Sequence, residues 1–199
     1  GISLALEAGR AAYIPLAHRS SDGLDLLGDG EVVQIPLKEA IEVLKPLLED
    51  ASVLKIGQNL KYDWVVLARQ GIRMAPIDDT MLMSYALDAG VHGHGMDELS
   101  EFYFEHKPIS FKEIVGSGKS QITFDLVPLA EATKYAAEDA DITLRLWHVL
   151  KPRLVADKKM LVYETLERPL VPVLAEMEMA GIVVDRAMLA GLSQRFADE

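Results

Sequence analysis

The sequence contains no cysteine, so it can form neither a disulfide framework nor a thiolate metal site. Basic residues are in the minority, 20 against 31 acidic ones, and the formal net charge is −11. This balance argues against long-range electrostatic attraction to nucleic acid, although a local basic patch could still serve.

Long hydrophobic runs are also missing. No stretch approaches the ~20 apolar residues of a membrane-spanning helix, and no basic segment precedes a short apolar one as in a secretory signal. Hydrophobic residues still make up 50% of the 199-residue chain, which allows a sizeable core in one domain or one domain plus part of another. We therefore expect a soluble cytoplasmic protein without a membrane partner.

The beginning of the chain predicts a β-hairpin, because "ISLALE" alternates in polarity, "EAGR" is a turn, and "AAYIPLA" returns. A chain without an initial methionine that opens inside a hairpin is expected to be a piece of a longer protein. Residues 20–31, rich in glycine, serine and aspartate, are predicted to form a surface loop. Strands and helices then alternate, which favours an α/β domain with a mixed sheet flanked by helices.

Three further segments organise the chain. Residues 53–57, an apolar run, predict a buried strand, and residues 58–71 predict a helix with Asn59 as its N-cap and Gly71 as its stop. A long helix is predicted from about residue 128 to residue 154. From about Lys158 the pattern changes to helix, turn, short strand and helix, which need not share the first core. We therefore divide the chain into residues 1–156 and 157–199.

Two predicted helices carry an aspartate on their apolar side. In the first helix the residues sharing one side are Leu60, Asp63, Trp64 and Leu67. In the long helix, Tyr135 and Asp139 begin a stripe that continues through Ile142, Leu146 and Val149. Such carboxylates either accept hydrogen bonds from backbone N–H groups or hold a divalent cation, which prefers oxygen ligands. The spacing alone does not decide between these two roles.

The surrounding residues resemble a known family. "GQNLKYD" and, downstream, "YAAEDAD" are similar to the second and third motifs of the 3′–5′ exonuclease domain of bacterial family A DNA polymerases, in the Y-x-x-x-D form of the DEDD exonucleases. The segments "AAYIPLAH", "DTML", "KPISF" and "GSGKSQITF" resemble the same domain in the same order. The tail "ERPLVPVLAEMEMAGIVVD" resembles the beginning of the polymerase domain.

The resemblance implies a ribonuclease-H-like fold and hydrolysis of the 3′-terminal phosphodiester of DNA, for proofreading during replication and repair synthesis. It implies two Mg²⁺ ions, for which Mn²⁺ or Zn²⁺ could substitute. The implied partners are a single-stranded or frayed 3′ end and the polymerase domain of the same chain. The implied roles are metal binding by Asp63 and Asp139, orientation of the attacking water by Tyr135, and DNA contact by Gln58, Asn59, Tyr62 and Phe111. For Tyr62 and Phe111, simple packing is the alternative, because stacking on DNA requires an exposed face.

One family motif is not found. In the family, a D-x-E pair lies on a strand just before the hairpin, and that strand is not in this sequence; Glu7, at the hairpin turn, is no substitute. The resemblance therefore implies an active parent enzyme and an inactive 199-residue piece. The alternative function is that of a non-catalytic module that supports the polymerase domain.

Overall fold

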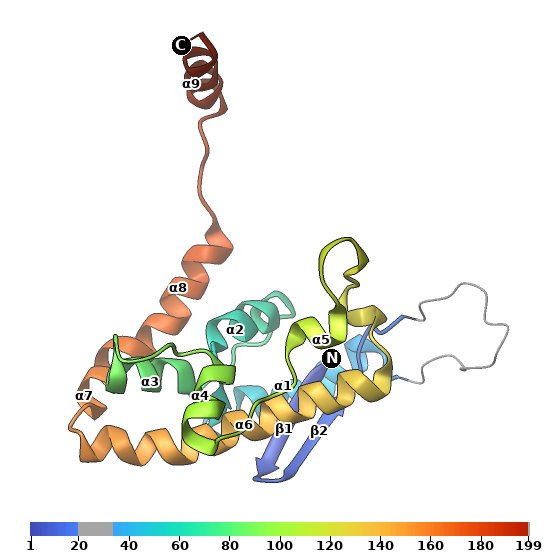
Figure 1. Cartoon of the computed structure of the whole chain (residues 1–199), viewed down its shortest axis with the longest axis vertical. Coiled ribbons are helices and arrows are strands. Elements are labelled where there is room, and N and C mark those ends of the chain that lie inside the picture. Colours follow the sequence, from blue (N-terminus) through green and yellow to red (C-terminus); the bar gives the residue numbers. More distant parts are fainter. Residues whose placement is uncertain (20–33, 199) are drawn as a thin grey trace, which may run out of the picture.

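The computed structural model describes residues 1–19 and 34–198 (Figure 1). The loop predicted at residues 20–31 lies outside the described residues. The rest is a mixed α/β structure that is mostly helical and contains small sheets. None of the described helices combines the length and the apolar character needed to cross a membrane.

The predicted hairpin is confirmed. Strands β1 (Ile2–Glu7) and β2 (Arg10–Ile14) pair antiparallel, from Ile2 opposite Ile14 to Glu7 opposite Arg10. Gly9 in the turn adopts φ +80°, a left-handed conformation that glycine tolerates without steric cost. The strand β2 ends immediately before Pro15, which has no N–H for a ladder.

The second pair of strands is parallel. Strand β3 (Lys55–Gly57) lies within the predicted apolar strand and pairs with β4 (Ile77–Asp79). The sequence predicts one mixed sheet, whereas the strands of the described residues form two separate two-stranded sheets. A groove that is lined by residues of both β1 and β3 separates the two sheets, so neither strand pairs with the other across it.

Helices make up most of the remainder. The longest is α6 (Leu129–Ala156), which confirms the long helix predicted from the apolar stripe. The others before it are α1 (Leu37–Glu49), α2 (Leu60–Arg69), α3 (Thr80–Asp88), α4 (Met96–Phe104), α5 (Phe111–Val115) and two short 3₁₀ turns, η1 (Gly118–Ser120) and η2 (Phe124–Leu126). After α6 come α7 (Met160–Val162), a π-helical turn η3 (Tyr163–Glu167), α8 (Arg168–Ala180) and α9 (Arg186–Asp198).

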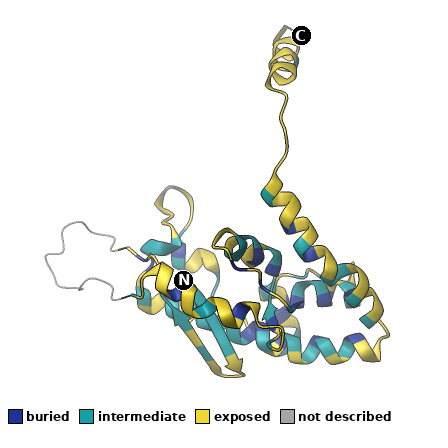
Figure 2. Ribbon diagram, turned by 180° about the vertical axis from the view of Figure 1, so that it is seen from behind, coloured by how far each residue is buried: buried dark blue, intermediate teal, exposed yellow. Residues whose placement is uncertain are grey.

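Helix α6 is the centre of the core. It runs along the hairpin and packs against α3 and α4 (Figure 1). Its fully buried leucines, Leu146, Leu150 and Leu154, cluster with Met83 of α3 and Leu99 of α4. Figure 2 shows the buried residues concentrated where these helices meet. Half-buried Tyr135 and Asp139 occupy the N-terminal half of the same helix, in the part that crosses the hairpin.

The segment after residue 156 is only partly separate. In α8, Val171 and Ala175 are buried against Trp64 of α2 and Ile72, so α8 shares a core with the preceding domain. Residues 181–185 are extended, but in the described residues they pair with no strand, so the short strand predicted there is wrong. A strand needs a neighbour for its N–H and C=O groups, and Val183 is fully exposed. In Figure 1, α9 stands apart from the rest of the structure.

This packing predicts a difference between two neighbouring positions of α8. Ala175→Asp places a carboxylate against Trp64 and Ile72 and should destabilise the fold by several kcal/mol, on the order of 3. Val173→Asp, at a half-exposed position of the same helix, should cost less than about 1 kcal/mol. Chemical denaturation followed by circular dichroism measures both values, and equal losses would contradict a shared core.

Candidate functional site

A groove of about 580 Å³ lies between the two sheets. Its lining combines residues 1–6 of the hairpin, residues 53–58 around β3, and apolar side chains from α1, α2 and α6. Two of its lining residues are acidic, Asp63 from α2 and Asp139 from α6. The fold thus brings to one groove two carboxylates that are far apart in the sequence.

Asp63 occupies the first turn of α2, lines this groove and is an exposed residue. Partial desolvation by the walls of the groove raises the pKa of its carboxyl to about 6, and the negative charge of Asp79 adds to the rise. A hydrogen bond with backbone N–H opposes this effect. The charged form of Asp63 is therefore poorly stabilised by the protein alone.

Asp139 lines the same groove from the N-terminal half of α6 and is half-buried. Its buried Oδ1 atom has no hydrogen-bond partner among the described residues. Burial raises the pKa of this carboxyl to about 7, with the phenol of Tyr135 opposing the rise and the charges of Asp97 and Glu138 adding to it. A buried carboxylate oxygen without a donor is destabilising unless a proton or a cation reaches it.

Tyr135 lies one helical turn before Asp139 and interacts with it. Burial, followed by the charge of Asp139, raises the pKa of the Tyr135 phenol, so the hydroxyl keeps its proton at neutral pH. The ring of Tyr135 contacts two phenylalanines, Phe111 and Phe124, each with its centroid 6.0 Å away. These contacts limit the orientations that the phenol can adopt.

The two aromatic residues predicted to contact DNA both have exposed surface. Phe111 is 48% exposed, while one face stacks on Phe124 with the ring centroids 6.1 Å apart. Tyr62, on α2 next to Asp63, is 70% exposed. Stacking on a base requires such a free face, and neither residue is buried in the core.

Gln58 and Asn59 differ in their surroundings. The Gln58 amide donates to the backbone oxygen of His94 (2.8 Å) and accepts from the Thr80 hydroxyl (2.5 Å), so it holds the loop before α4 against the end of β3. Asn59 is exposed and has φ 55°, at the predicted N-cap position. Asn59 therefore occupies the N-cap position as predicted, but its side chain makes no capping hydrogen bond, so that part of the prediction is wrong.

The cap of α2 comes instead from Asp79, at the end of β4. Its carboxylate accepts from the backbone N–H groups of Asn59 (3.2 Å) and Leu60 (2.7 Å). Sequence reasoning missed this residue, although an aspartate directly before "TMLMSYAL" is a typical helix-start signal. Sequence reasoning also missed Asp97, whose negative charge contributes to the raised pKa of both Tyr135 and Asp139.

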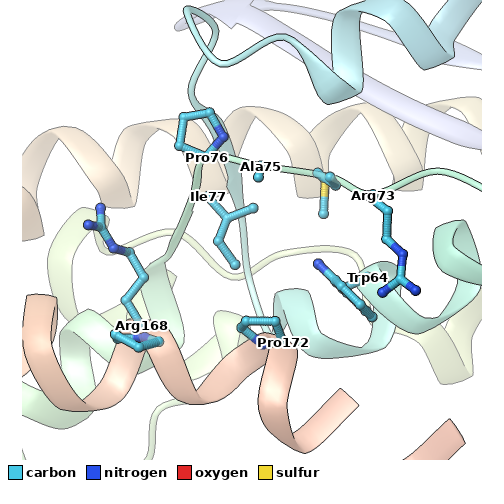
Figure 3. Close-up of a pocket in the computed structure, with 9 residues that line it drawn as sticks. Trp64, Arg73, Ala75, Pro76, Ile77, Arg168 and Pro172 are labelled. Carbon is cyan, nitrogen blue, oxygen red and sulfur yellow. The ribbon is translucent and has the colours of Figure 1, made fainter. Parts of the chain in front are cut away.

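A second hollow, of about 310 Å³, lies between α2, β4 and α8 (Figure 3). Trp64, Pro76, Ile77 and Pro172 form an apolar lining, with Arg73 and Arg168 at opposite sides (Figure 3). Both arginines already form ion pairs, Arg73 with Glu176 and Arg168 with Asp78 and Glu164. This hollow lies at the packing interface between α8 and the preceding domain, and Asp63 and Asp139 do not line it.

Comparison with known proteins identifies the chain. The sequence profile of the 3′–5′ exonuclease family found in DNA polymerase I matches residues 1–155. The chain belongs to this exonuclease family. The chain is 59% identical to DNA polymerase I of Rhizobium leguminosarum over 189 residues and 44% identical to that of Pseudomonas aeruginosa over 199 residues. These matches cover 94% and 98% of this chain, but 18% and 21% of the relatives, so the chain spans about a fifth of their length.

Solved structures agree with this assignment. The POL domain of Pol1 from M. smegmatis, in complex with DNA primer-template and dNTP, matches with a TM-score of 0.65 and 26% identity, over 83% of this chain and 25% of that one. Brucella melitensis NrnC with bound Mg²⁺ matches with a TM-score of 0.57 and 27% identity, over 69% and 64%. The resemblance inferred from the motifs is therefore confirmed, whereas the roles of individual residues stay predictions.

The groove does not contain a complete set of protein ligands for a metal ion among the described residues. Among the described residues, no group of three or more His, Asp or Glu side chains lies close enough together to hold a metal ion. Asp63 and Asp139 are the two acidic residues that the described part of the exonuclease domain contributes to the groove wall. Any ion bound there needs further ligands, such as water, substrate phosphates or additional carboxylates.

The raised pKa of Asp139 predicts a pH-dependent gain of stability in Asp139→Asn. The folded-state pKa of about 7 lies above the ordinary value of 3.8, so the folded protein binds more protons than the unfolded chain between these values. The stability that the protonated carboxyl provides is complete below about pH 4 and is lost as the pH rises through about 7. Asp139→Asn should therefore stabilise the fold at pH 8, by on the order of 2 kcal/mol, and much less at pH 4.

Denaturation at the two pH values, without divalent metal, measures this effect. Glu101→Gln, the same change of carboxylate to amide at an exposed position of α4, is the matched control and should alter stability little at either pH. Loss of stability in Asp139→Asn at pH 8 would mean that the carboxylate is well satisfied in the folded protein.

Proposed function

We propose that this exonuclease domain hydrolyses the 3′-terminal phosphodiester of single-stranded or frayed DNA, and that it proofreads for the polymerase of its parent protein during replication and repair synthesis. The observation that carries the proposal is the groove lined by both Asp63 and Asp139, with Tyr135 interacting with Asp139. The DNA-bound polymerase relative and the Mg²⁺-bound nuclease relative support the substrate and the ion.

Asp63 and Asp139 would hold divalent metal, in the complete site two Mg²⁺ ions, with Mn²⁺ or Zn²⁺ as substitutes. Carboxylate oxygens suit these hard ions, and the unpartnered Oδ1 of Asp139 is an acceptor that a cation could occupy. The bound metal would supply the Lewis acidity that activates a water molecule and stabilises the leaving 3′ oxygen.

The other residues of the chain bind and orient. Because the phenol of Tyr135 keeps its proton, it would position the attacking water by hydrogen bonding and would not remove a proton from it. The exposed faces of Tyr62 and Phe111 would stack on the terminal bases, and Asn59 lines the same end of α2. Gln58 would act less directly, by holding the loop at His94 in place.

The groove also fits the ribonuclease-H-like fold. A further extended strand placed between β1 and β3 would pair with both and join the two sheets into one mixed sheet. In the family such a strand carries the D-x-E motif, so its carboxylates would reach the same groove as Asp63 and Asp139. We therefore propose that the 199 residues alone are inactive because two carboxylates hold metal weakly.

The segment after residue 156 would begin the polymerase domain, with residues 1–156 as the exonuclease domain. Apolar side chains remain exposed on α8 and α9, including Leu170, Val173, Met177, Met188 and Phe196. The rest of a polymerase domain would cover them, because contiguous exposed apolar surface marks an interface. A partner of this kind, acting on bacterial DNA, implies a cytoplasmic location.

The second candidate is a non-catalytic module that supports the polymerase domain. The burial of Val171 and Ala175 in the core of the exonuclease domain favours such a structural role. The two functions are compatible, and only the first requires the carboxylates of the groove.

Activity tests the leading proposal. A version extended at its N-terminus by a D-x-E strand should trim 3′-labelled single-stranded DNA in the presence of Mg²⁺, whereas the 199 residues should not. In the extended version, Asp63→Asn and Asp139→Asn should each lower the rate at least about a hundredfold. Glu101→Gln serves as the control with full activity. Full activity in both aspartate variants would leave only the supporting role.

Strand pairing can be tested separately from activity. In the extended version, the amides of β1 and β3 that face the groove should exchange with solvent at least about tenfold more slowly than in the 199-residue chain, because ladder hydrogen bonds protect them. Amides of β2, on the far side of the hairpin, are the internal control. Unchanged exchange at both strands would rule out a joined sheet.

A further inference from the structure

Two adjacent aspartates at the end of β4, Asp78 and Asp79, are almost completely buried, with 0% and 1% exposure. Neither lines the groove, and although Asp79 begins the family-like segment "DTML", no role has been assigned to it above. Buried carboxylates persist only where several donors surround them. Each of these two has four donors, and the donors belong to different parts of the molecule.

The carboxylate of Asp79 caps two helices at once. It accepts from the N–H groups of Met81 (2.9 Å) and Leu82 (3.3 Å), which begin α3. It also accepts from Asn59 (3.2 Å) and Leu60 (2.7 Å), which begin α2. Because no capping hydrogen bond comes from the Asn59 side chain, the position of the first turn of α2 depends on Asp79.

That first turn carries Asp63, one helical turn after Asn59. Three residues that are predicted to act at the nuclease site, Asn59, Tyr62 and Asp63, therefore lie on a segment of backbone that Asp79 holds in place. A displacement of this turn by about 1 Å would move Asp63 relative to Asp139, which is held on a different helix. Displacements of this size at a catalytic site change rates strongly.

Asp78 connects the end of β4 to α6 and to the segment that follows α6. Its carboxylate accepts from Trp147 (2.8 Å) and Lys151 (3.1 Å) of α6, from the Tyr163 hydroxyl (2.9 Å), and from Arg168 (3.4 Å) at the start of α8. Burial and the charge of Asp78 raise the pKa of Tyr163, so its hydroxyl remains a donor.

Tyr163 joins the two aspartates. Its hydroxyl donates to Asp78 and accepts from the backbone N–H of Asp79 (2.9 Å). Tyr163 is fully buried and lies in the π-helical turn that leads into α8, a type of turn that often marks functional positions. A chain of contacts therefore runs from Arg168 of α8 to Asp78, from there through Tyr163 to Asp79, and from the Asp79 carboxylate to the first turn of α2.

We propose that Asp79 is the positioning residue of the nuclease site, and that Tyr163 makes its placement depend on the segment that follows α6. Through this pair, movement of α8 with the remainder of the parent protein would alter the placement of Asp63. The positioning role rests on the proposed function of Asp63 as a metal ligand. The structural link itself can be tested without metal or activity.

The test of Asp79 uses Asp79→Ser in the 199-residue chain. A serine N-cap can still serve α3, but its short side chain cannot also reach the N–H of Leu60. Amide exchange measured by NMR should rise about tenfold or more at Asn59 and Leu60, while amides in the middle of α6 keep their protection. Asp185→Ser is the matched control, because Asp185 caps only α9, through Met188 (3.0 Å).

A second readout separates positioning from general support. The affinity for Mn²⁺, measured by water proton relaxation at a temperature where Asp79→Ser is fully folded, should fall about tenfold in this variant. Absence of Mn²⁺ binding to the unaltered chain would count against the proposed function, because Asp63 would then not be a metal ligand. Unchanged exchange at Leu60 would overturn the positioning role itself, whatever the metal result.

Tyr163→Phe tests the connection to α8. It removes one hydroxyl, and exchange should rise about fivefold or more at Asp79 and at Leu60. Tyr103→Phe is the control, since Tyr103 makes similar contacts to Asp88 and Arg153 elsewhere. Faster exchange only at Asp79 would overturn the coupling, and equal effects in both variants would assign the change to general destabilisation.

Discussion

The central constraint on this structure is that two carboxylates, Asp63 and Asp139, line one groove, and that a buried oxygen of Asp139 has no hydrogen-bond donor among the described residues. Desolvation raises the pKa of each carboxyl. A protein that served only stability would place apolar or neutral side chains here. A bound cation, as proposed above, would make the arrangement favourable and would link the energetics of the fold to the chemistry of the exonuclease family.

Helices α6 and α2 hold the side chains of this groove in place in different ways. Helix α6 places Asp139 and Tyr135 on its half-buried face, and its leucine-rich C-terminal half anchors it in the core. Helix α2 is too short to be stable alone, and a neighbouring strand end caps it. The proposed metal ligands come from separate elements, so the proposed activity depends on rigid placement of their side chains. The first turn of α2 and the segment after α6 meet at the same buried pair of aspartates.

The sequence predicted the local features well, and the reasons are physical. The hairpin, the long helix α6 and the stop at Gly71 follow from alternation, apolar periodicity and glycine conformation, all of which are local. The family could be inferred because its motifs occur in order. The features that were missed depend on long-range contacts: Asp79 caps α2 from 20 residues away, and Tyr163 reaches Asp78 from 85 residues away. The strand predicted near Val183 failed because its apolar pattern has no neighbouring strand in the described structure.

The most direct measurement is an anomalous difference map from crystals of the 199-residue chain soaked in MnCl₂. The account predicts a peak in the groove, weakly occupied, with oxygens of Asp63 or Asp139 among its ligands and water completing the rest. Loss of the peak in Asp139→Asn crystals would confirm the assignment. Peaks confined to other surface carboxylates, with the groove free of manganese at saturating concentration, would contradict it.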